Sequence, residues 1–144
     1  APAPPRTRLW IMIETCACLP RLHELAACAA DTRLAGFVLG TNDLAKEMHA
    51  RLTPARTPFL PVLTMAVIAA RAHGLVVLDG VCNEFRDLAL FRAEAEQGLE
   101  FGAGDGQSLP LTCEKVLATP NWRAILIDSN ALNCLVDSLH QACR

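Results

Sequence analysis

Three short apolar runs recur along the chain, and each is followed by a stretch with the features of a helix. The runs are LWIMIE at residues 9–14, LAGFVLG at 34–40 and LVVLDG at 75–80. The runs are too short for buried helices. They also lack the alternation of apolar and polar residues that marks a strand with one solvent-exposed face, so each run favours a strand covered on both faces. Strands of this kind alternating with helices indicate an α/β layer structure with a parallel sheet.

The segments between these runs carry helix signals. Residues 19–30 place Pro20 near a helix start, and residues 57–74 confine their prolines to the beginning and end at Gly74, as helices commonly do. Residues 83–98 are expected to form a further helix. Apolar residues at helical spacing mark the core-facing side of these helices: Leu22, Leu25, Ala26, Leu63, Val67, Ala70, Leu88 and Phe91.

The pattern is weaker from this last helix onward. Asn83 is its expected N-cap and Gly98 its stop. A fourth strand, LEFGA at residues 99–103, and a last helix at 109–118 would complete about four strand–helix units. The tail adds a strand-like run at 124–127 and an amphipathic helix, whose place in the fold the pattern leaves open. That helix carries Leu132, Leu135, Val136 and Leu139.

Composition argues against several classes of function. The chain has 144 residues, of which 52% are hydrophobic, enough for the core of about one domain. Its 13 bases and 15 acids are mixed along the chain, so no basic stripe is available to bind nucleic acid. Its apolar runs are far shorter than the roughly 20 residues that span a bilayer. The first residues, APAPPRTR, lack the apolar core of a signal peptide, which indicates a cytoplasmic chain or a cut one.

The cysteines and histidines show no metal-site spacing. The seven cysteines form no C-x-x-C pair, and no histidine stands near them at zinc-finger spacing. Small buried thiols are expected, with an adventitious metal or redox role as the alternative. His23 and His49 lack partners at ligand spacing and are expected to be solvated or to cap helices. We therefore assign no function to these side chains.

Acidic residues follow the carboxyl end of each expected strand. They are Glu14, Asp43, Asp79 and Asp105. In parallel α/β folds, functional groups gather at this edge because the loops converge there while the strands hold them rigidly. A single acid in such a place can equally be a helix N-cap or a turn former, but a set in register favours a site. Converging carboxylates suit a hard divalent ion such as Mg²⁺, with Glu14 as one ligand.

Four segments together resemble one known family. They are RLWIMIETCACLPRLHELA, LAGFVLGTNDLAKEM, AARAHGLVVLDGVCNEFRD and QGLEFGAGDGQSL. In this order they are similar to the HpcH/HpaI aldolase and citrate lyase β-subunit family of CoA-ester lyases. The resemblance covers about residues 7–109, and its motifs are specific.

The resemblance implies an enzyme that cleaves or forms a C–C bond in a 3-hydroxyacyl-CoA thioester such as citryl-, malyl- or citramalyl-CoA, using Mg²⁺. In that family the glutamate of the ET motif and the aspartate of the GxxD motif bind the metal, which implies metal roles for Glu14 and Asp43. The family's DG motif lines the substrate pocket and corresponds to Asp79 and Gly80. The chemistry would be a retro-Claisen or retro-aldol cleavage, and no catalytic residue is assigned.

The same resemblance implies that the chain is the C-terminal half of a TIM (β/α)8 barrel. Residues 1–109 would form this half-barrel and residues 110–144 a divergent tail, helical in part. The family's first four strands, with the arginine that clamps the substrate carboxylate, have no counterpart here. After its eighth strand the family continues as DGKxxIHP, whereas this chain has DGQSLPLT, with Gln107 in the place of the lysine.

Two other functions stay open. One is an aldolase of the same superfamily that acts on a free 2-oxo acid in place of a CoA thioester. The other is a truncated or non-catalytic half-barrel that only assembles with a partner, because unpaired strand edges at residues 9–14 and 99–103 would seek one. The chain is expected to form a homo-oligomer.

Overall fold

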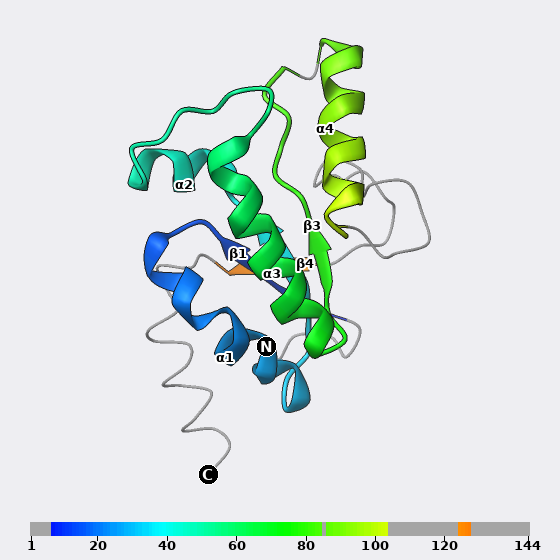
Figure 1. Ribbon diagram of the computed structural model, residues 1–144. Helices are drawn as coiled ribbons and strands as arrows, with labels where there is room; N and C mark the ends of the chain where they lie inside the picture. Colours follow the sequence, from blue (N-terminus) through cyan, green and yellow to red (C-terminus); the bar gives the residue numbers. More distant parts are fainter. Residues whose placement is uncertain (1–6, 85, 104–123, 128–144) are drawn as a thin grey trace.

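The computed structural model describes residues 7–84, 86–103 and 124–127. Strands and helices alternate along this part of the chain (Figure 1). The elements in chain order are β1 (Arg8–Ile13), the 3-10 helix η1 (Cys16–Arg21), α1 (Leu22–Ala27), η2 (Cys28–Ala30), β2 (Leu34–Leu39), α2 (Thr41–Glu47), η3 (Thr57–Phe59), α3 (Leu60–Ala72), β3 (Val76–Leu78), α4 (Leu88–Glu100) and β4 (Ala124–Ile127).

The strands form one parallel sheet in the order β3-β2-β1-β4. This confirms the expected α/β class and the parallel pairing of the first three strands. The strand-like run at residues 124–127 is β4, which pairs with β1. Because β1 therefore lies between two strands, the expectation of an open edge at residues 9–14 is wrong.

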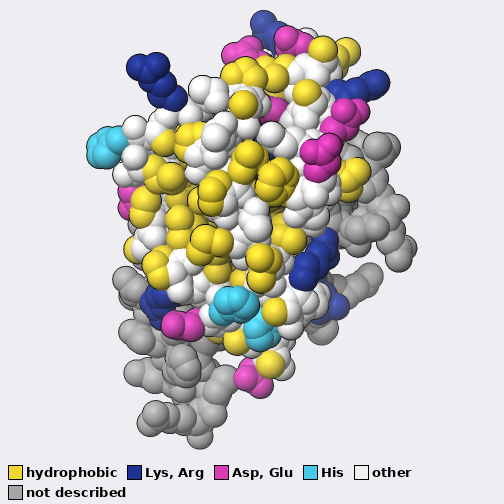
Figure 2. Space-filling view, viewed as in Figure 1, with side chains coloured by type: hydrophobic (Ala, Val, Ile, Leu, Met, Phe, Trp, Pro, Cys, Tyr) yellow, Lys and Arg dark blue, Asp and Glu magenta, His cyan; other side chains and the backbone are white. Residues whose placement is uncertain are grey.

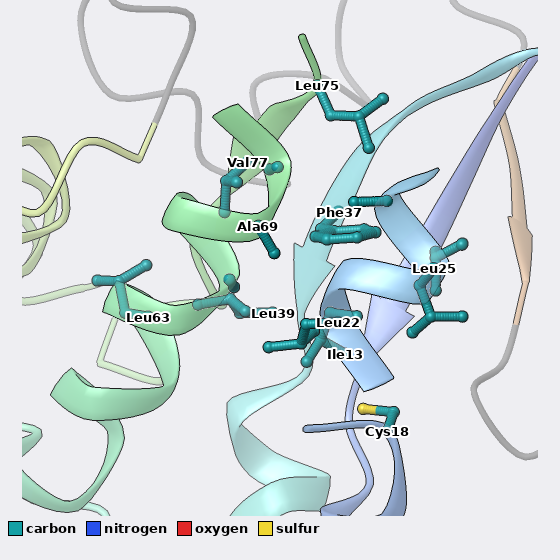
Figure 3. Close-up of a cluster of buried hydrophobic side chains, with 14 of the residues drawn as sticks. Ile13, Cys18, Leu22, Leu25, Phe37, Leu39, Leu63, Ala69, Leu75 and Val77 are labelled. Atoms are coloured by element: carbon teal, nitrogen blue, oxygen red, sulfur yellow. The ribbon is translucent and has the colours of Figure 1, made fainter. Parts of the chain in front are cut away.

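Helices α1 and α3 cover one face of the sheet, and the main core lies beneath them (Figure 1). Alternate residues of each strand point toward this layer, as the two-residue period of a strand requires. Figure 3 shows Phe37 of β2 pointing between the two helices, and its side chain is fully buried. The expected helix positions Leu22, Leu25 and Leu63 are confirmed as core residues.

The opposite face of the sheet carries a smaller apolar cluster. Trp10, Val38 and Leu78 are its buried members. Trp10 stands level with Gly36 of the neighbouring strand, and a methyl group on Gly36 would lie only 2.5 Å from a ring carbon of the indole. The missing side chain of Gly36 therefore lets the Trp10 ring lie against the backbone of β2. Only glycine permits such a close approach.

Two helices end as glycine-terminated helices commonly do. At the end of α3, Gly74 has φ +70, and the N–H of Leu75 donates to the carbonyl of Ala70 at 2.9 Å. The same arrangement ends α4 at Gly102, with φ +86. This hydrogen-bond pattern satisfies the last carbonyls of a helix. The prediction of a stop at Gly74 is confirmed.

The predicted strand at residues 99–103 is wrong. The side chain of Asp87 accepts hydrogen bonds from the N–H groups of Ala89 and Leu90, both at 3.1 Å, so Asp87 rather than Asn83 is the N-cap. The helix consequently starts later and runs through Gly98 to Glu100. Residues 99–103 hold the end of the helix and its turn, and they present no strand edge.

The surface also departs from the expected pattern. Leu88, expected in the core, is 76% exposed because it is the first residue of α4, beyond the sheet. Figure 2 shows hydrophobic side chains gathered over the face that α3 covers, where Met65 and Ile68 are 45% and 57% exposed. Within the described residues, no helix combines the length and the apolar character needed to cross a membrane.

We expect Gly36→Ala to lower the free energy of unfolding by about 1–3 kcal/mol, because the added methyl group meets the Trp10 ring and the backbone of β3. The substitution should also shift the emission of Trp10, measured in a Trp122→Phe background. Gly74→Ala is the control, since nothing lies within 4 Å of that site and only the positive φ penalises it, by about 1 kcal/mol. Unchanged stability and emission in the first variant would contradict the proposed packing.

Candidate functional site

Glu14 follows β1 and lies against the turn that joins β2 to α2. The N–H of Gly40 in this turn donates to the carbonyl of Ile13 at 2.9 Å. A methyl group on Gly40 would run into the Cβ of Glu14 and would lie 3.1 Å from its Oε2 atom. The glycine therefore leaves the space in which the half-buried Glu14 side chain rests on the neighbouring turn.

Asp43 stands in the first turn of α2, three residues after Gly40. Its carboxylate accepts a hydrogen bond from Lys46 Nζ at 2.7 Å, and the two side chains are 54% and 78% exposed. An exposed ion pair at this spacing contributes less than about 1 kcal/mol to stability. Lys46 would therefore compete only weakly with another ligand for the Asp43 carboxylate. The structure thus places Glu14 and Asp43 at the same edge of the sheet, as expected.

The carboxylate oxygens at this edge of the sheet fit Mg²⁺ better than a metal whose ligands all come from the protein. In the described part of the chain, no group of three or more His, Cys, Asp or Glu side chains could hold a metal ion. Mg²⁺ commonly uses one or two carboxylates and keeps several waters. Glu14 directly follows β1 and Asp43 lies in the first turn of α2, and these two are the residues that would hold the ion.

Cys16 connects this edge to the end of α2. Its N–H donates a hydrogen bond to the Glu47 carboxylate. Partial loss of hydration, the hydrogen bond with Glu47 and the nearby Glu47 charge raise the pKa of the Cys16 thiol. Cys18 and Cys82 are buried as expected, whereas the expectation is wrong for exposed Cys16. The last three cysteines lie outside the described residues.

The histidines fit their expected structural roles. His49 has φ +52 just beyond α2, and the N–H of the next residue, Ala50, donates to the carbonyl of Ala45 at 2.9 Å. His23 is exposed, and its ring lies edge-on to that of His73, with centroids 6.4 Å apart. Neither residue lies among the strand-end acids.

Asp79 differs from Glu14 and Asp43 because it is buried. It is only 7% exposed. Its Oδ2 accepts a hydrogen bond from Arg56 Nη1 at 2.8 Å, and its Oδ1 accepts one from the N–H of Gly80 at 2.7 Å. Gly80 lies against the start of α2, where a methyl group on it would be 2.5 Å from Thr41 Oγ1. Asp105 lies outside the described residues.

Arg56 is the residue that the sequence analysis missed. It is 8% exposed and has φ +50, a conformation that costs a non-glycine residue about 1–2 kcal/mol. Its guanidinium contacts also include Gln97 Oε1 at 2.9 Å and the carbonyl of Glu94 at 3.1 Å. A buried aspartate needs a charged or hydrogen-bonding partner, but Arg56 and Asp79 are 23 positions apart in the chain, and the sequence gives no signal of their pairing.

A small cavity lies beside this ion pair. It is lined by Leu39, Thr41, Arg56, Phe59, Leu60, Leu63 and Asp79. Its volume of about 10 Å³ has room for about one water molecule. The cavity is therefore a packing feature beneath the edge of the sheet and too small to hold an organic substrate.

Comparison with known proteins shows one family throughout. The sequence model of the HpcH/HpaI aldolase/citrate lyase family matches residues 3–109. A (3S)-malyl-CoA thioesterase of Cereibacter sphaeroides strain KD131 is 47% identical over 105 residues, which are 73% of this chain and 35% of that protein. The homologue of strain ATCC 17023 is 46% identical over the same length. The chain thus spans about a third of the length of these curated relatives.

Solved structures agree on the fold. RipC from Yersinia pestis superposes with a TM-score of 0.61 at 21% identity, covering 92% of this chain and 51% of that one. A citrate lyase from Burkholderia xenovorans LB400 gives 0.58 at 18% identity, with 92% and 38% covered. The magnesium and glyoxylate complex of Haloferax volcanii malate synthase gives 0.58 at 20% identity, with 89% and 40% covered. The three parallel strands β1, β2 and β3 therefore match part of TIM-barrel aldolase and lyase structures.

We expect Glu47→Gln to lower the pKa of the Cys16 thiol, because it removes the negative charge that helps to raise that pKa. A lower pKa means more thiolate at a fixed pH. Alkylation of Cys16 by iodoacetamide at pH 8, followed by mass spectrometry of its peptide, should become faster by roughly 2- to 5-fold. Exposed Glu24→Gln on α1 is the control. An unchanged rate after Glu47→Gln would show that Glu47 does not act on the thiol.

Proposed function

The chain belongs to the HpcH/HpaI aldolase/citrate lyase family, and on this premise we propose that it is part of a Mg²⁺-dependent lyase that cleaves a C–C bond in a 3-hydroxyacyl-CoA thioester. Citryl-, malyl- and citramalyl-CoA define the substrate class. The curated relatives are named for a CoA ester of this class, malyl-CoA, which supports the assignment of the substrate.

The proposal includes a finer description of the fold. Residues 1–109 would supply about four strand–helix units of the C-terminal half of a TIM (β/α)8 barrel, and residues 110–144 a divergent tail. The strand–helix units that begin with β1, β2 and β3 support it. The fourth unit is not supported at residues 99–103, which belong to the end of α4 and its turn.

The observation that carries the proposal is the position of Glu14 on the turn that leads to Asp43. Glu14 rests against Gly40, and Asp43 follows in the first turn of α2. We propose that these carboxylates hold Mg²⁺. When bound, the ion supplies positive charge to substrate oxygens on which negative charge develops.

The remaining site residues shape the pocket. We propose that Asp79 and Gly80 line the substrate pocket, Gly80 by its backbone and Asp79 as a buried part of the wall. The Asp79 carboxylate is already engaged by Arg56 and by the N–H of Gly80, so it has little capacity to bind substrate directly. Among the described residues we assign no catalytic acid or base.

The proposed cleavage converts a 3-hydroxyacyl thioester into a carbonyl compound and a shorter acyl thioester. The 3-hydroxyl group loses its proton and becomes a carbonyl group, and the bond between the hydroxyl-bearing carbon and the carbon next to the thioester breaks. The electron pair of that bond stays on the carbon next to the thioester, which then takes up a proton. Malyl-CoA would give acetyl-CoA and glyoxylate.

A thioesterase is the second candidate, and the name of the 47% identical relative favours it. Water would attack the thioester carbonyl, the C–S bond would break, and the free acid and the CoA thiol would leave. Two further alternatives are an aldolase for free 2-oxo acids and a non-catalytic half-barrel that assembles with a partner. A homo-oligomer is part of the proposal, and the exposed Met65 and Ile68 on α3 offer apolar surface that such an assembly could bury.

We expect the 144-residue chain to bind Mg²⁺ weakly and to show no measurable turnover alone. Glu14→Gln and Asp43→Asn should each weaken the binding measured by titration calorimetry, because each substitution removes one of the two carboxylates that would hold the ion. Glu24→Gln, an exposed acid paired with Arg21 on α1, should bind as the unmodified chain does. Equal Mg²⁺ affinity in all four proteins would exclude the metal assignment.

We expect a longer protein that carries this sequence to release acetyl-CoA and glyoxylate from (3S)-malyl-CoA in a Mg²⁺-dependent reaction. Glyoxylate can be measured as its phenylhydrazone and the free CoA thiol with a disulfide reagent. Free CoA without glyoxylate would favour the thioesterase, and pyruvate released from a free aldol substrate would favour the 2-oxo-acid aldolase. Turnover by the longer protein that survives Glu14→Gln would contradict the role of Glu14.

A further inference from the structure

The Arg56–Asp79 ion pair joins three parts of the structure that are distant in sequence. Arg56 lies between α2 and η3, and Asp79 directly follows β3. The guanidinium also reaches α4, through Gln97 Oε1 at 2.9 Å and the carbonyl of Glu94 at 3.1 Å. Gln97 in turn donates to the carbonyl of Ala55 at 3.2 Å. The loop before η3 is therefore tied both to the end of β3 and to α4.

The ion pair is buried, and one of its two residues has a strained backbone. Both side chains are only 9% exposed, and Arg56 adopts a left-handed backbone with φ +50. Strained backbone of this kind persists where the surroundings fix it, and it gathers at functional sites. Gly98 of α4 lies so close to Asp79 that any side chain there would collide with Oδ2. The carboxylate is thus enclosed by arginine, helix backbone and its own turn.

The contacts continue from Asp79 to the start of α2. Asp79 Oδ1 accepts from the N–H of Gly80 at 2.7 Å, which fixes the turn after β3. Gly80 then lies against Thr41, the first residue of α2. On the outer side, Asn42 and Asn83 exchange two side-chain hydrogen bonds of 3.0 and 2.9 Å. These contacts fix the first turn of α2, which carries Asp43, against the turn after β3.

We propose that Arg56 and Asp79 are positioning residues that set the place of the first turn of α2, and of Asp43 within it, through the Gly80–Thr41 contact. This positioning rests on the contacts alone, whereas its consequence for Mg²⁺ rests on the proposed function. Asp79 is then a buried support of the site, since both of its carboxylate oxygens are already hydrogen-bonded. Arg56 holds the buried Asp79 carboxylate in a fixed orientation through the hydrogen bond to Oδ2.

The test uses the double variant Arg56→Met/Asp79→Asn, which removes both charges and leaves no buried ion unpaired. Arg51→Met, an exposed arginine that precedes Arg56 in the same loop, is the control. Circular dichroism first shows whether the double variant folds. Proton–nitrogen NMR spectra should then show shifted backbone amides at Thr41, Gly80 and Asp43 and shifted side-chain amides at Asn42 and Asn83, with these signals unchanged in the control.

A folded double variant whose signals at residues 41–43 match those of the unmodified chain would overturn the proposal. If the double variant does not fold, Arg56→Lys replaces it, since it keeps the charge but loses the forked geometry; the same shifts support the proposal and their absence overturns it. Mg²⁺ affinity should fall about tenfold in whichever of these variants folds. Shifted signals without Glu14-dependent Mg²⁺ binding by the unmodified chain would support the positioning and refute the metal assignment.

Discussion

The parallel pairing of β1 with β2 is the constraint on which the rest of the structure depends. Ile13 stands level with Leu39, so the two strands end together and the chain leaves both at the same edge. The hydrogen bond from Gly40 to Ile13 closes this pairing. A shift of the register by one residue would turn the Phe37 ring away from the helix layer. Loss of the burial of this aromatic side chain would cost about 1.5–3 kcal/mol.

Two kinds of acid stand at that edge, and their surroundings separate their roles. Asp43 is exposed and has only Lys46 as an ion-pair partner in the described residues, so it stays available to ligands. Asp79 is buried against Arg56, where removal of one partner from such an ion pair costs about 3–5 kcal/mol. In the proposed site, Asp43 would therefore bind and Asp79 would support, although both follow strands of the same sheet.

Several features of the fold and of the site could be predicted from local pattern. The apolar runs, the stop at Gly74 and the core positions of α1 rest on periodicity and backbone preference, which neighbouring residues already express. The errors have two origins. Asp87 rather than Asn83 caps α4 because its side chain accepts hydrogen bonds from the N–H groups of Ala89 and Leu90, a choice between two nearby cap residues that the local pattern did not settle. Gly98, the expected stop, lies inside α4, where it packs against Asp79, a residue distant in sequence.

The sequence by itself determined the alternation of strands and helices, the parallel sheet and the family, because hydrophobic spacing and short motifs are written in consecutive residues. It also indicated that acids follow the strands. Only the tertiary structure decided which acid is available, since burial and charge pairing depend on groups that meet across the fold. Arg56 and Asp79 are separated by 23 positions in the chain, and only the fold brings the loop before η3 to the end of β3, where their charges meet.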